Sequence, residues 1–343
     1  MRAVHWLIRA TELFSRNLGK VFNYFYFPIA WATRGRKLVF AIHAGNRDLA
    51  GASKVAVFVH HDKRGVVHEY VCYYLQSLRD AGFEILFVSN GRGLGGKAVD
   101  SIRMMCTEIL CRRNVGYDFG AYRDGLRYLG DLSRFQQVLL INDSVYGPFT
   151  DLTELLSRCT ERAAIWGVTD SWSGRYHLQS YFLLIGRTAL VSHDFARFWS
   201  GMVMMHSKQW VIQHYEIGFT QAMIRSGQEC AALVPYRAVT RDLINASRSG
   251  ELSDDALEPT MARFFAGLVW RVESGIPLNP MHQFWDHVIR KSRCPFIKRE
   301  LIVRNPAKIP HAYLWEAAIA SVSSYDTGMI TRHVKTVVRN RAP

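Results

Sequence analysis

One stretch of the chain, residues 112–149, constrains the fold more than any other. Its last third is an apolar run, Gln137–Ile141, with the length and composition of a buried strand. Asn142, Asp143 and Ser144 follow this run directly. In an open α/β sheet, ligands bind at the carboxyl ends of the strands. The stretch therefore predicts an α/β fold whose chemistry lies at residues 142–144.

The residues before this stretch repeat an order of strand, helix and strand. Residues 55–59 and 84–88 are apolar runs, and residues 66–81 between them carry apolar side chains at helical spacing up to Gly82. Such an order predicts a right-handed crossover in a parallel sheet. Further strands are predicted over 105–110, 138–141, 163–168 and 177–185, and further helices over 122–129, 153–158, 195–205 and 219–226. The predicted fold class is α/β, with a mostly parallel central sheet flanked by helices, an N-terminal amphipathic helical extension and a helical C-terminal part.

Polar loops follow the predicted strands and should converge on one edge of the sheet. They cover 60–65, 89–97, 112–120, 142–148 and 169–174, and the glycine-rich residues 91–97 are predicted to form a flexible loop. The candidate binding residues in and beside these loops are His60, His61, Asp62, Asn90, Asn114, Gly116, Asp118, Gly120, Tyr122, Asn142, Ser144 and Asp170.

Asp143 and Asp118 each have two interpretations. With its polar neighbours, Asp143 offers hard oxygen ligands for Mg²⁺ or Mn²⁺, which in turn would hold a diphosphate. The same triplet, followed by Gly147 and Pro148, is also typical of a turn. Asp118 can cap the helix after it, accept a hydrogen bond from a ribose or sugar hydroxyl, or do both. Both carboxylates therefore stay candidates for a site and for local structure.

Glu216 is the candidate general base. It precedes the predicted helix 219–226, where a carboxylate gains from the helix dipole, and at the edge of a site it could take a proton from a hydroxyl. His214, two residues earlier, is a further binding candidate. Like His60 and His61, it can also be read as a surface histidine.

The net charge of +14 and the pI near 9.7 indicate an anionic partner. Residues 1–50 hold eight Arg or Lys against two Asp or Glu among apolar residues at helical spacing, which predicts a segment lying on an anionic membrane surface or packing on the domain behind it. The apolar run around Pro28 is too short to span a bilayer. Positive charge also concentrates in 290–304 and in the C-terminal tail. With no nucleic-acid-binding module, a nucleic-acid partner is not expected.

The predicted organisation has four parts. A basic amphipathic segment covers 1–50, and a catalytic domain covers 51–240. The acceptor-side part of that domain covers 241–310, and a helix with a basic tail covers 311–343. The six cysteines show neither paired nor zinc-binding spacing, which favours a reducing cytoplasm.

Several of these segments together resemble the rhamnan synthesis protein F family. They read VAVFVHHD, RRNVGYDFGAYRDGL, VLLINDSVYGPF and HYEIGFTQAMIRSG, and a fifth covers 279–306. The resemblance implies a bacterial glycosyltransferase of O-antigen, rhamnan or other surface-polysaccharide assembly, typically a rhamnosyltransferase. It implies dTDP-rhamnose as the donor, a lipid-linked glycan as the acceptor, and a peripheral place on the cytoplasmic face of the inner membrane.

That family is similar to glycosyltransferases of the GT-A fold, and the likeness implies roles for single residues. Asn142, Asp143 and Ser144 take the place of the metal-binding Asp-x-Asp motif, with one acidic residue where two are usual. Lys or Arg side chains could neutralise the leaving diphosphate instead. Glu216 takes the place of the catalytic base of an inverting transfer. The alternative is a non-catalytic, membrane-associated scaffold that keeps a degenerate form of this fold.

Overall fold

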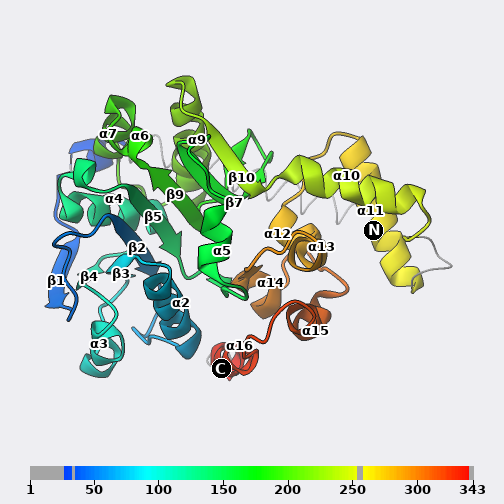
Figure 1. Cartoon of the computed structure of the whole chain (residues 1–343), viewed down its shortest axis with the longest axis horizontal. Helices are drawn as coiled ribbons and strands as arrows, with labels where there is room; N and C mark the ends of the chain where they lie inside the picture. The colour runs from blue at the N-terminus through cyan, green and yellow to red at the C-terminus, as the bar shows by residue number, and fades with distance from the viewer. Residues whose placement is uncertain (1–26, 33–34, 253–257, 340–343) are drawn as a thin grey trace.

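The computed structural model describes residues 27–32, 35–252 and 258–339, which form a central sheet covered by helices on both faces (Figure 1). The sheet has nine strands in the order β1-β4-β3-β2-β5-β9-β7-β10, with β8 paired to β7. Its strands are β1 (Val39–Ala44), β2 (Lys54–His60), β3 (Glu84–Asn90), β4 (Glu108–Arg112), β5 (Gln137–Asn142), β7 (Ile165–Ser171), β8 (His177–Leu178), β9 (Phe182–Gly186) and β10 (Cys230–Val234).

The strand directions confirm the predicted α/β class with a mostly parallel sheet. β2 pairs in parallel with β3 and β5, and β3 with β4. β9 is antiparallel to both β5 and β7, so β7 runs in the same direction as β5, and β10 is parallel to β7. Six of the nine strands therefore share one direction, and β1, β8 and β9 run against them.

Alternation along β2 shows why helices cover both faces. Ala56 and Phe58 join the core on one face, while Val55, Val57 and Val59 join the core on the other, and all five are fully buried. The first face carries α2 (Glu69–Asp80), α3 (Gly96–Arg103) and α5 (Leu152–Ser157). The second carries α4 (Tyr117–Leu129), α6 (Arg187–Leu190), α7 (His193–Ser200) and α9 (Ile217–Arg225).

The order of the strands reverses between β2 and β5. From β2 the chain continues through β3 and β4 on one side, and then returns to place β5 on the other side of β2. The backbone NH of Asp143 donates to Val59 O at 3.1 Å, so the two strand ends lie side by side. Loops that leave neighbouring strands in opposite directions open a crevice between them, which is where ligands bind in such sheets.

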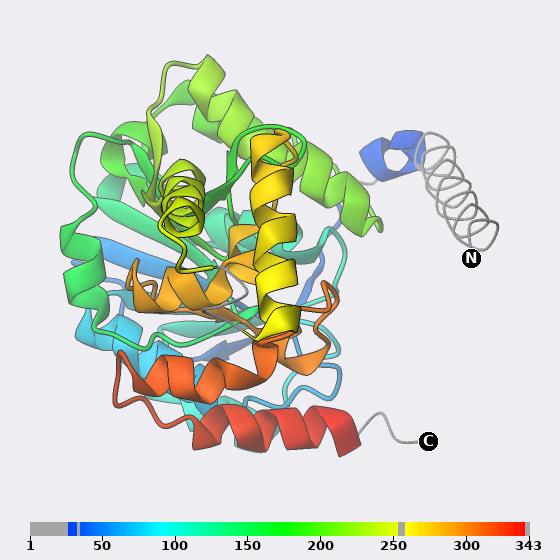
Figure 2. The ribbon, with the colours of Figure 1, turned by 90° about the vertical axis from the view of Figure 1, so that its right-hand side faces the viewer.

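The C-terminal part is helical, as predicted, and packs on the first face of the sheet (Figure 2). β11 (Ile297–Lys298) forms a separate two-stranded sheet with β6 (Val145–Tyr146). The helices of this part are α10 (Tyr236–Arg248), α11 (Pro259–Glu273), α12 (Pro280–Gln283), α13 (Trp285–Arg290), α14 (Arg299–Val303), α15 (Trp315–Ala320) and α16 (Gly328–Arg339). The 3₁₀ turns among the described residues are η1 (Leu132–Arg134) and η3 (Ala312–Leu314). Among the described residues no helix has the length and apolar content that crossing a membrane requires.

The structure differs from several predicted elements. Residues 96–97 begin α3 instead of ending a loop, and residues 169–171 belong to β7, where they are buried. Residues 177–185 form two strands, β8 and β9. The segment 311–343 holds η3, α15 and α16 instead of one helix, because a turn at 321–327 separates α15 from α16. Each difference involves a short element whose apolar pattern is too brief to fix its bounds.

Two further predicted boundaries also differ from the structure, the start of the helix predicted over 122–129 and the start of the sheet. The helix predicted over 122–129 begins at Tyr117, because Gly116 adopts a left-handed conformation with φ of 80° and turns the chain into the helix. β1 lies within the predicted segment 1–50 but pairs with β4, so the sheet begins before residue 50. The predicted amphipathic stripe of that segment falls on residues 1–26, outside the described residues.

Candidate active site

Buried polar side chains end the three strands β3, β4 and β5 at the same edge of the sheet. On β4, Arg112 Nε donates to Asp124 Oδ2 at 2.9 Å, and Nη1 donates to Asn90 Oδ1. Asn90 Nδ2 donates to Tyr117 O at 3.1 Å. Both polar groups of Asn90 are thus bound to the protein. Asn90 therefore holds the end of β3 against the start of α4.

The glycines predicted to contact a ligand serve the turn into α4 instead. A Cβ on Gly116 would lie 2.6 Å from Met204 Sδ, and one on Gly120 would lie 2.4 Å from Val115 O. Neither position admits a larger residue without moving its neighbours. Asn114 Oδ1 is buried in this turn and has no hydrogen-bond partner among the described residues.

Asn142, at the end of β5, binds two candidates from α4. Its Nδ2 donates to Asp118 Oδ2 at 3.2 Å and to the Tyr122 hydroxyl at 3.1 Å. Its Oδ1 accepts from the Ser144 backbone NH at 3.0 Å, which forms the turn that the sequence suggested. The helix is capped by Gly116, without a side-chain cap, so the capping interpretation of Asp118 is wrong.

Asp118 lies among charged groups that come from several elements. Burial raises the pKa of its carboxyl to about 6, and the Asp143 carboxylate adds to the rise, while His61 opposes it. Weaker effects on this pKa come from Glu216, which raises it, and from Lys298, which lowers it. These groups therefore share one electrostatic neighbourhood.

Hydrogen bonds link Glu216 to the end of β5. The Tyr122 hydroxyl, which accepts from Asn142, donates to Ser180 O at 2.9 Å. Ser180 donates from its backbone NH at 3.0 Å and from its hydroxyl at 2.8 Å, both to Glu216 Oε1. The two predicted catalytic regions, 73 residues apart from Asp143 to Glu216 along the chain, are thus joined by one polar network.

The backbone around Glu216 differs from the prediction. Glu216 ends a π-helical turn, η2 (Ile212–Glu216), which continues from α8 (Lys208–Val211) into α9 without a loop. The helix dipole at a free N-terminus, on which the prediction relied, is therefore absent at this position. Such turns are frequent at functional sites, since they re-aim the side chains that follow. Glu216 is half-buried and faces Ser180.

Asp143 is paired with an arginine that the sequence analysis had not selected. Arg299 Nη1 donates to Asp143 Oδ2 at 2.9 Å and to the Tyr70 hydroxyl at 2.6 Å. The Asp143 side chain is 6% exposed and that of Arg299 is 25% exposed. Next to it, Lys298 Nζ lies 3.4 Å from Ser144 Oγ and 4.4 Å from the centre of the Tyr181 ring.

A short ladder between β6 and β11 puts these two cations beside Asp143. Lys298 pairs with Val145, and the backbone NH of Arg299 donates to Ser144 O at 3.0 Å. Gly147 makes this approach possible, since a Cβ there would lie 2.2 Å from Pro295 O. In the sequence, both residues lie in the basic run 290–304 and in the segment 279–306 of the family resemblance, and neither feature pointed to Asp143.

The residues around Asp143 do not fit a divalent cation. Its Oδ2 is occupied by Arg299, and the residues beside it supply an amide and a hydroxyl but no second carboxylate. Across the described parts of the chain, no three His, Cys, Asp or Glu side chains gather as a metal site would require. The metal-binding interpretation of Asp143 has no support in this geometry.

The candidates at the end of β2 divide into a histidine without a hydrogen-bond partner among the described residues and two bound residues. His60 is 1% exposed, and neither ring nitrogen has a partner among the described residues. Burial lowers its pKa, and nearby Asp143 opposes this. His61 Nδ1 lies 2.5 Å from Asn90 O. Asp62 accepts from the backbone NH groups of Arg64 and Val66, at 2.7 and 3.1 Å, and so builds its own loop.

Asp170 and His214 lie outside the network. Asp170 is buried in β7 and accepts from the backbone NH of Tyr236, the first residue of α10. This contact, and the burial that raises the pKa of its carboxyl, suit a helix-anchoring role. His214 is exposed, with its ring stacked on Trp210 at 3.7 Å between centroids. His214 is therefore a surface histidine, as one of its two interpretations had it.

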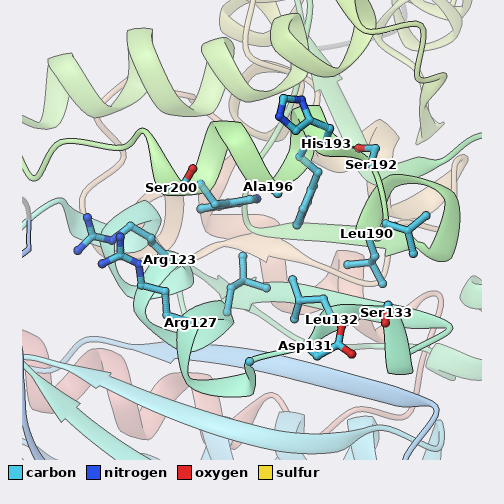
Figure 3. A pocket seen from close by; sticks show the side chains of 15 residues that line it. Arg123, Arg127, Asp131, Leu132, Ser133, Leu190, Ser192, His193, Ala196 and Ser200 are labelled. Atoms are coloured by element: carbon cyan, nitrogen blue, oxygen red, sulfur yellow. Dashed lines mark hydrogen bonds between the residues drawn. The ribbon is translucent and has the colours of Figure 1, made fainter.

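A cavity of about 510 Å³ lies at the opposite edge of the sheet (Figure 3). Gly130–Ser133, shortly before β5, and Leu190–Ser192, at the end of α6, line it together with α4 and α7. Gln137 pairs with Gly186 beside it, so the cavity is at the amino end of β5. Arg123 and Arg127 lie at one end. None of the predicted site residues lines it.

Comparisons with known proteins identify relatives of the chain. The chain is 28% identical over 268 residues to virulence protein VirA of Vibrio anguillarum, covering 76% of this chain and 83% of that protein. It is 31% identical over 206 residues to the uncharacterized protein y4gN of Sinorhizobium fredii (strain NBRC 101917 / NGR234), covering 57% of this chain and 53% of that one.

Among solved structures, a likeness extends to the galactosyltransferase LgtC in complex with donor and acceptor sugar analogues. It has a TM-score of 0.28 and 16% identity, and covers 51% of this chain and 73% of that chain. A family model matches residues 85–246, which include Asp118, Asn142, Asp143 and Glu216. The predicted resemblance is confirmed over this range, because the family that it represents is rhamnan synthesis protein F.

Proposed function

We propose that the protein is a glycosyltransferase of bacterial surface-polysaccharide synthesis. The observation that carries this proposal is the hydrogen-bond network from Asn142 to Glu216, which joins the candidate general base to the crevice between β2 and β5. The family match over 85–246 supports it. Sugar transfer needs such a base close to the place where a charged leaving group is held.

The donor in this proposal is a nucleotide sugar bound across the ends of β2 and β5. Its nucleotide lies beside His60, His61 and the loop built by Asp62, and its diphosphate lies near Ser144. His60 supports this placement, since a buried imidazole with two unpartnered nitrogens costs free energy unless a ligand binds it.

Glu216 acts as the base in an inverting transfer. The acceptor hydroxyl oxygen forms the new bond to the anomeric carbon, and its proton moves to the Glu216 carboxylate. The bond from that carbon to the diphosphate breaks, and its electron pair leaves with the diphosphate. A positioned base contributes about 10²–10⁴-fold to the rate.

We also propose dTDP-rhamnose as the donor and a lipid-linked glycan as the acceptor, on the strength of the family description. The proposed place of the enzyme is the cytoplasmic face of the inner membrane. It rests on the basic, apolar composition of residues 1–50. Co-sedimentation with vesicles, with and without phosphatidylglycerol, tests the membrane proposal. Equal binding to neutral and anionic vesicles would contradict it.

A screen of nucleotide sugars by thermal shift tests the proposed function. A ligand that binds only the folded state raises the melting temperature, so one donor should stabilise the protein while others of the same charge do not. The same donor should then be hydrolysed or transferred. If no nucleotide sugar stabilises the protein, or if the bound one is never consumed, the glycosyltransferase proposal is contradicted and the alternative of a non-catalytic scaffold is favoured.

A further inference from the structure

One of the two cations beside Asp143 has no direct ion-pair partner among the described residues. Lys298 and Arg299 bring two positive charges, and Asp143 is the one carboxylate in ion-pair contact with either of them among the described residues. Lys298 Nζ is in contact with Ser144 Oγ and the face of Tyr181, neither of which carries a charge. An unpaired cation in such surroundings is costly unless an anion binds it.

The donors of these two side chains are also incompletely used. Both hydrogen bonds of the Arg299 side chain to described residues come from Nη1, which leaves Nε and Nη2 for another acceptor. Lys298 has one hydrogen bond to a hydroxyl, at 3.4 Å, although an ammonium group carries three donors. Burial lowers the pKa of Lys298, while Glu216 and Asp118 raise it, and the side chain is half-buried beside Ser144 and Tyr181.

The backbone fixes both cations relative to the turn at 142–144. The β6–β11 ladder places Lys298 opposite Val145, and Asp143 and Tyr70 hold the Arg299 guanidinium from two sides. Asp143 thus positions Arg299. Its place at the crevice is the one where a metal-dependent enzyme would carry a metal ligand, but its carboxylate binds an arginine instead.

We propose that Lys298 and Arg299 bind the diphosphate of the donor directly and take the place of a divalent cation. The inference rests on the proposed function, which it deepens by naming the groups that hold the leaving group. As the bond to the anomeric carbon breaks, the electron pair and negative charge move onto the diphosphate. The ammonium and the free guanidinium donors stabilise that charge by charge-assisted hydrogen bonds.

Calorimetric titration of the full chain with dTDP, with UDP and with inorganic pyrophosphate tests this inference. Each titration is made once in EDTA and once with Mn²⁺. We expect pyrophosphate, and whichever of dTDP and UDP binds more tightly, to bind. For each of these two probes, the dissociation constants in EDTA and with Mn²⁺ should agree within about twofold. Lys298→Met should weaken binding about tenfold to a hundredfold, as expected for the loss of one charge-assisted hydrogen bond.

Two further variants control for charge and folding. Lys291→Met removes the same charge from an exposed position in the same segment, where Lys291 lies 4.0 Å from Glu251, and should leave binding unchanged. Lys298→Arg keeps the charge and should retain most of the affinity. Melting temperatures of all variants identify any that fail to fold; if Lys298→Met does, Lys298→Gln, which also removes the charge, replaces it and should weaken binding where Lys298→Arg does not.

The outcomes separate this inference from the proposed function. Binding that needs Mn²⁺, or that is equal in Lys298→Met and wild type, overturns the inference and leaves the glycosyltransferase proposal standing. Pyrophosphate binding that Lys298→Met abolishes, without any binding of nucleoside diphosphate, supports the diphosphate site and overturns the nucleotide-sugar donor. Absence of binding by all three probes overturns both.

Discussion

The two edges of the central sheet present opposite combinations of space and charge. The amino edge beside β5 has a cavity of about 510 Å³, but its buried Arg123 is bound by Asp124 and by Met202 O. The carboxyl edge holds the turn at 142–144, where Lys298 has no carboxylate partner among the described residues and His60 has no partner for either ring nitrogen. The comparison teaches that polar groups without protein partners, and not the volume of a cavity, distinguish the edge where the site is proposed.

The largest effect that sharpens this contrast should come from Glu216→Gln. The substitution keeps an acceptor for Ser180 but removes the base, so turnover should fall about 10²–10⁴-fold while the donor still binds. Steady-state kinetics and donor titration measure the two effects. Glu229→Gln is the control, because Glu229 is an exposed carboxylate paired with Arg162. Loss of donor binding with retained turnover would contradict the role given to Glu216.

Asn142→Leu should have the next largest effect, on stability as well as on activity. It removes the Asn142 amide, so the Asp118 carboxylate and the Tyr122 hydroxyl each lose the hydrogen bond that they accept from it. We expect a loss of about 1–3 kcal/mol in the free energy of unfolding, measured by urea titration. Asn245→Leu, at an exposed position of α10, should change it by less than about 0.5 kcal/mol. Equal losses in the two variants would show that the network contributes nothing.

Lowering the pH should destabilise the protein through His333, behind the carboxyl edge. Nδ1 of this residue lies 2.7 Å from the Tyr146 hydroxyl, and its ring packs on His68 and Tyr70. Burial, with smaller effects from His68 and Arg299, lowers its pKa from 6.5 to about 3. Between these values the unfolded chain binds a proton that the folded protein does not. The stabilisation is therefore complete above about pH 6.5 and is lost as the pH falls toward 3.

The difference between wild type and His333→Gln isolates this effect from other titrating groups. From pH 6.5 to 5, wild type should lose up to about 2 kcal/mol more than the variant, since one pKa unit corresponds to about 1.4 kcal/mol. Urea titrations at the two pH values measure it. Parallel pH dependence in the two proteins would exclude His333 as the cause.

The smallest effect is expected at the amino edge. Arg127 is exposed and lines the cavity at the amino edge, yet Arg127→Ala should change the affinity for the donor by less than about twofold. Calorimetry on Arg127→Ala beside Lys298→Met makes the comparison direct. If Arg127→Ala weakened donor binding and Lys298→Met left it unchanged, the donor site would belong to the amino edge instead.

Local patterns were sufficient to predict the sheet and the position of the turn at 142–144. Continuous apolar runs such as 55–59 and 137–141 can be buried only in a sheet covered on both faces, which is how β2 and β5 occur. The polar residues at their ends could therefore be placed at one edge. Which of these residues bind the protein itself was not predictable, because Asn90, Asp62 and Asp170 have the same chemistry as ligand-binding residues.

The cations of the site could not be found from the sequence. Lys298 and Arg299 reach Asp143 through two strands of two residues each, and an element of that length has no detectable period. Lys298 lies 154 residues after Ser144 in the sequence, and folding brings the two side chains into contact. The π-helical turn that ends at Glu216 has no sequence signature either, so the helix that follows was predicted to begin at residue 219, whereas α9 begins at Ile217.

The most direct test of the account is the place where the donor binds. A photoreactive nucleoside diphosphate, such as an azido-uridine derivative, can be crosslinked to the full chain and the labelled peptides mapped by mass spectrometry. The account predicts labelling within residues 54–65, 84–92, 137–149 or 295–304, competed by unlabelled nucleoside diphosphate. Specific labelling confined to residues 126–134 or 187–200, around the cavity at the amino edge, would contradict it.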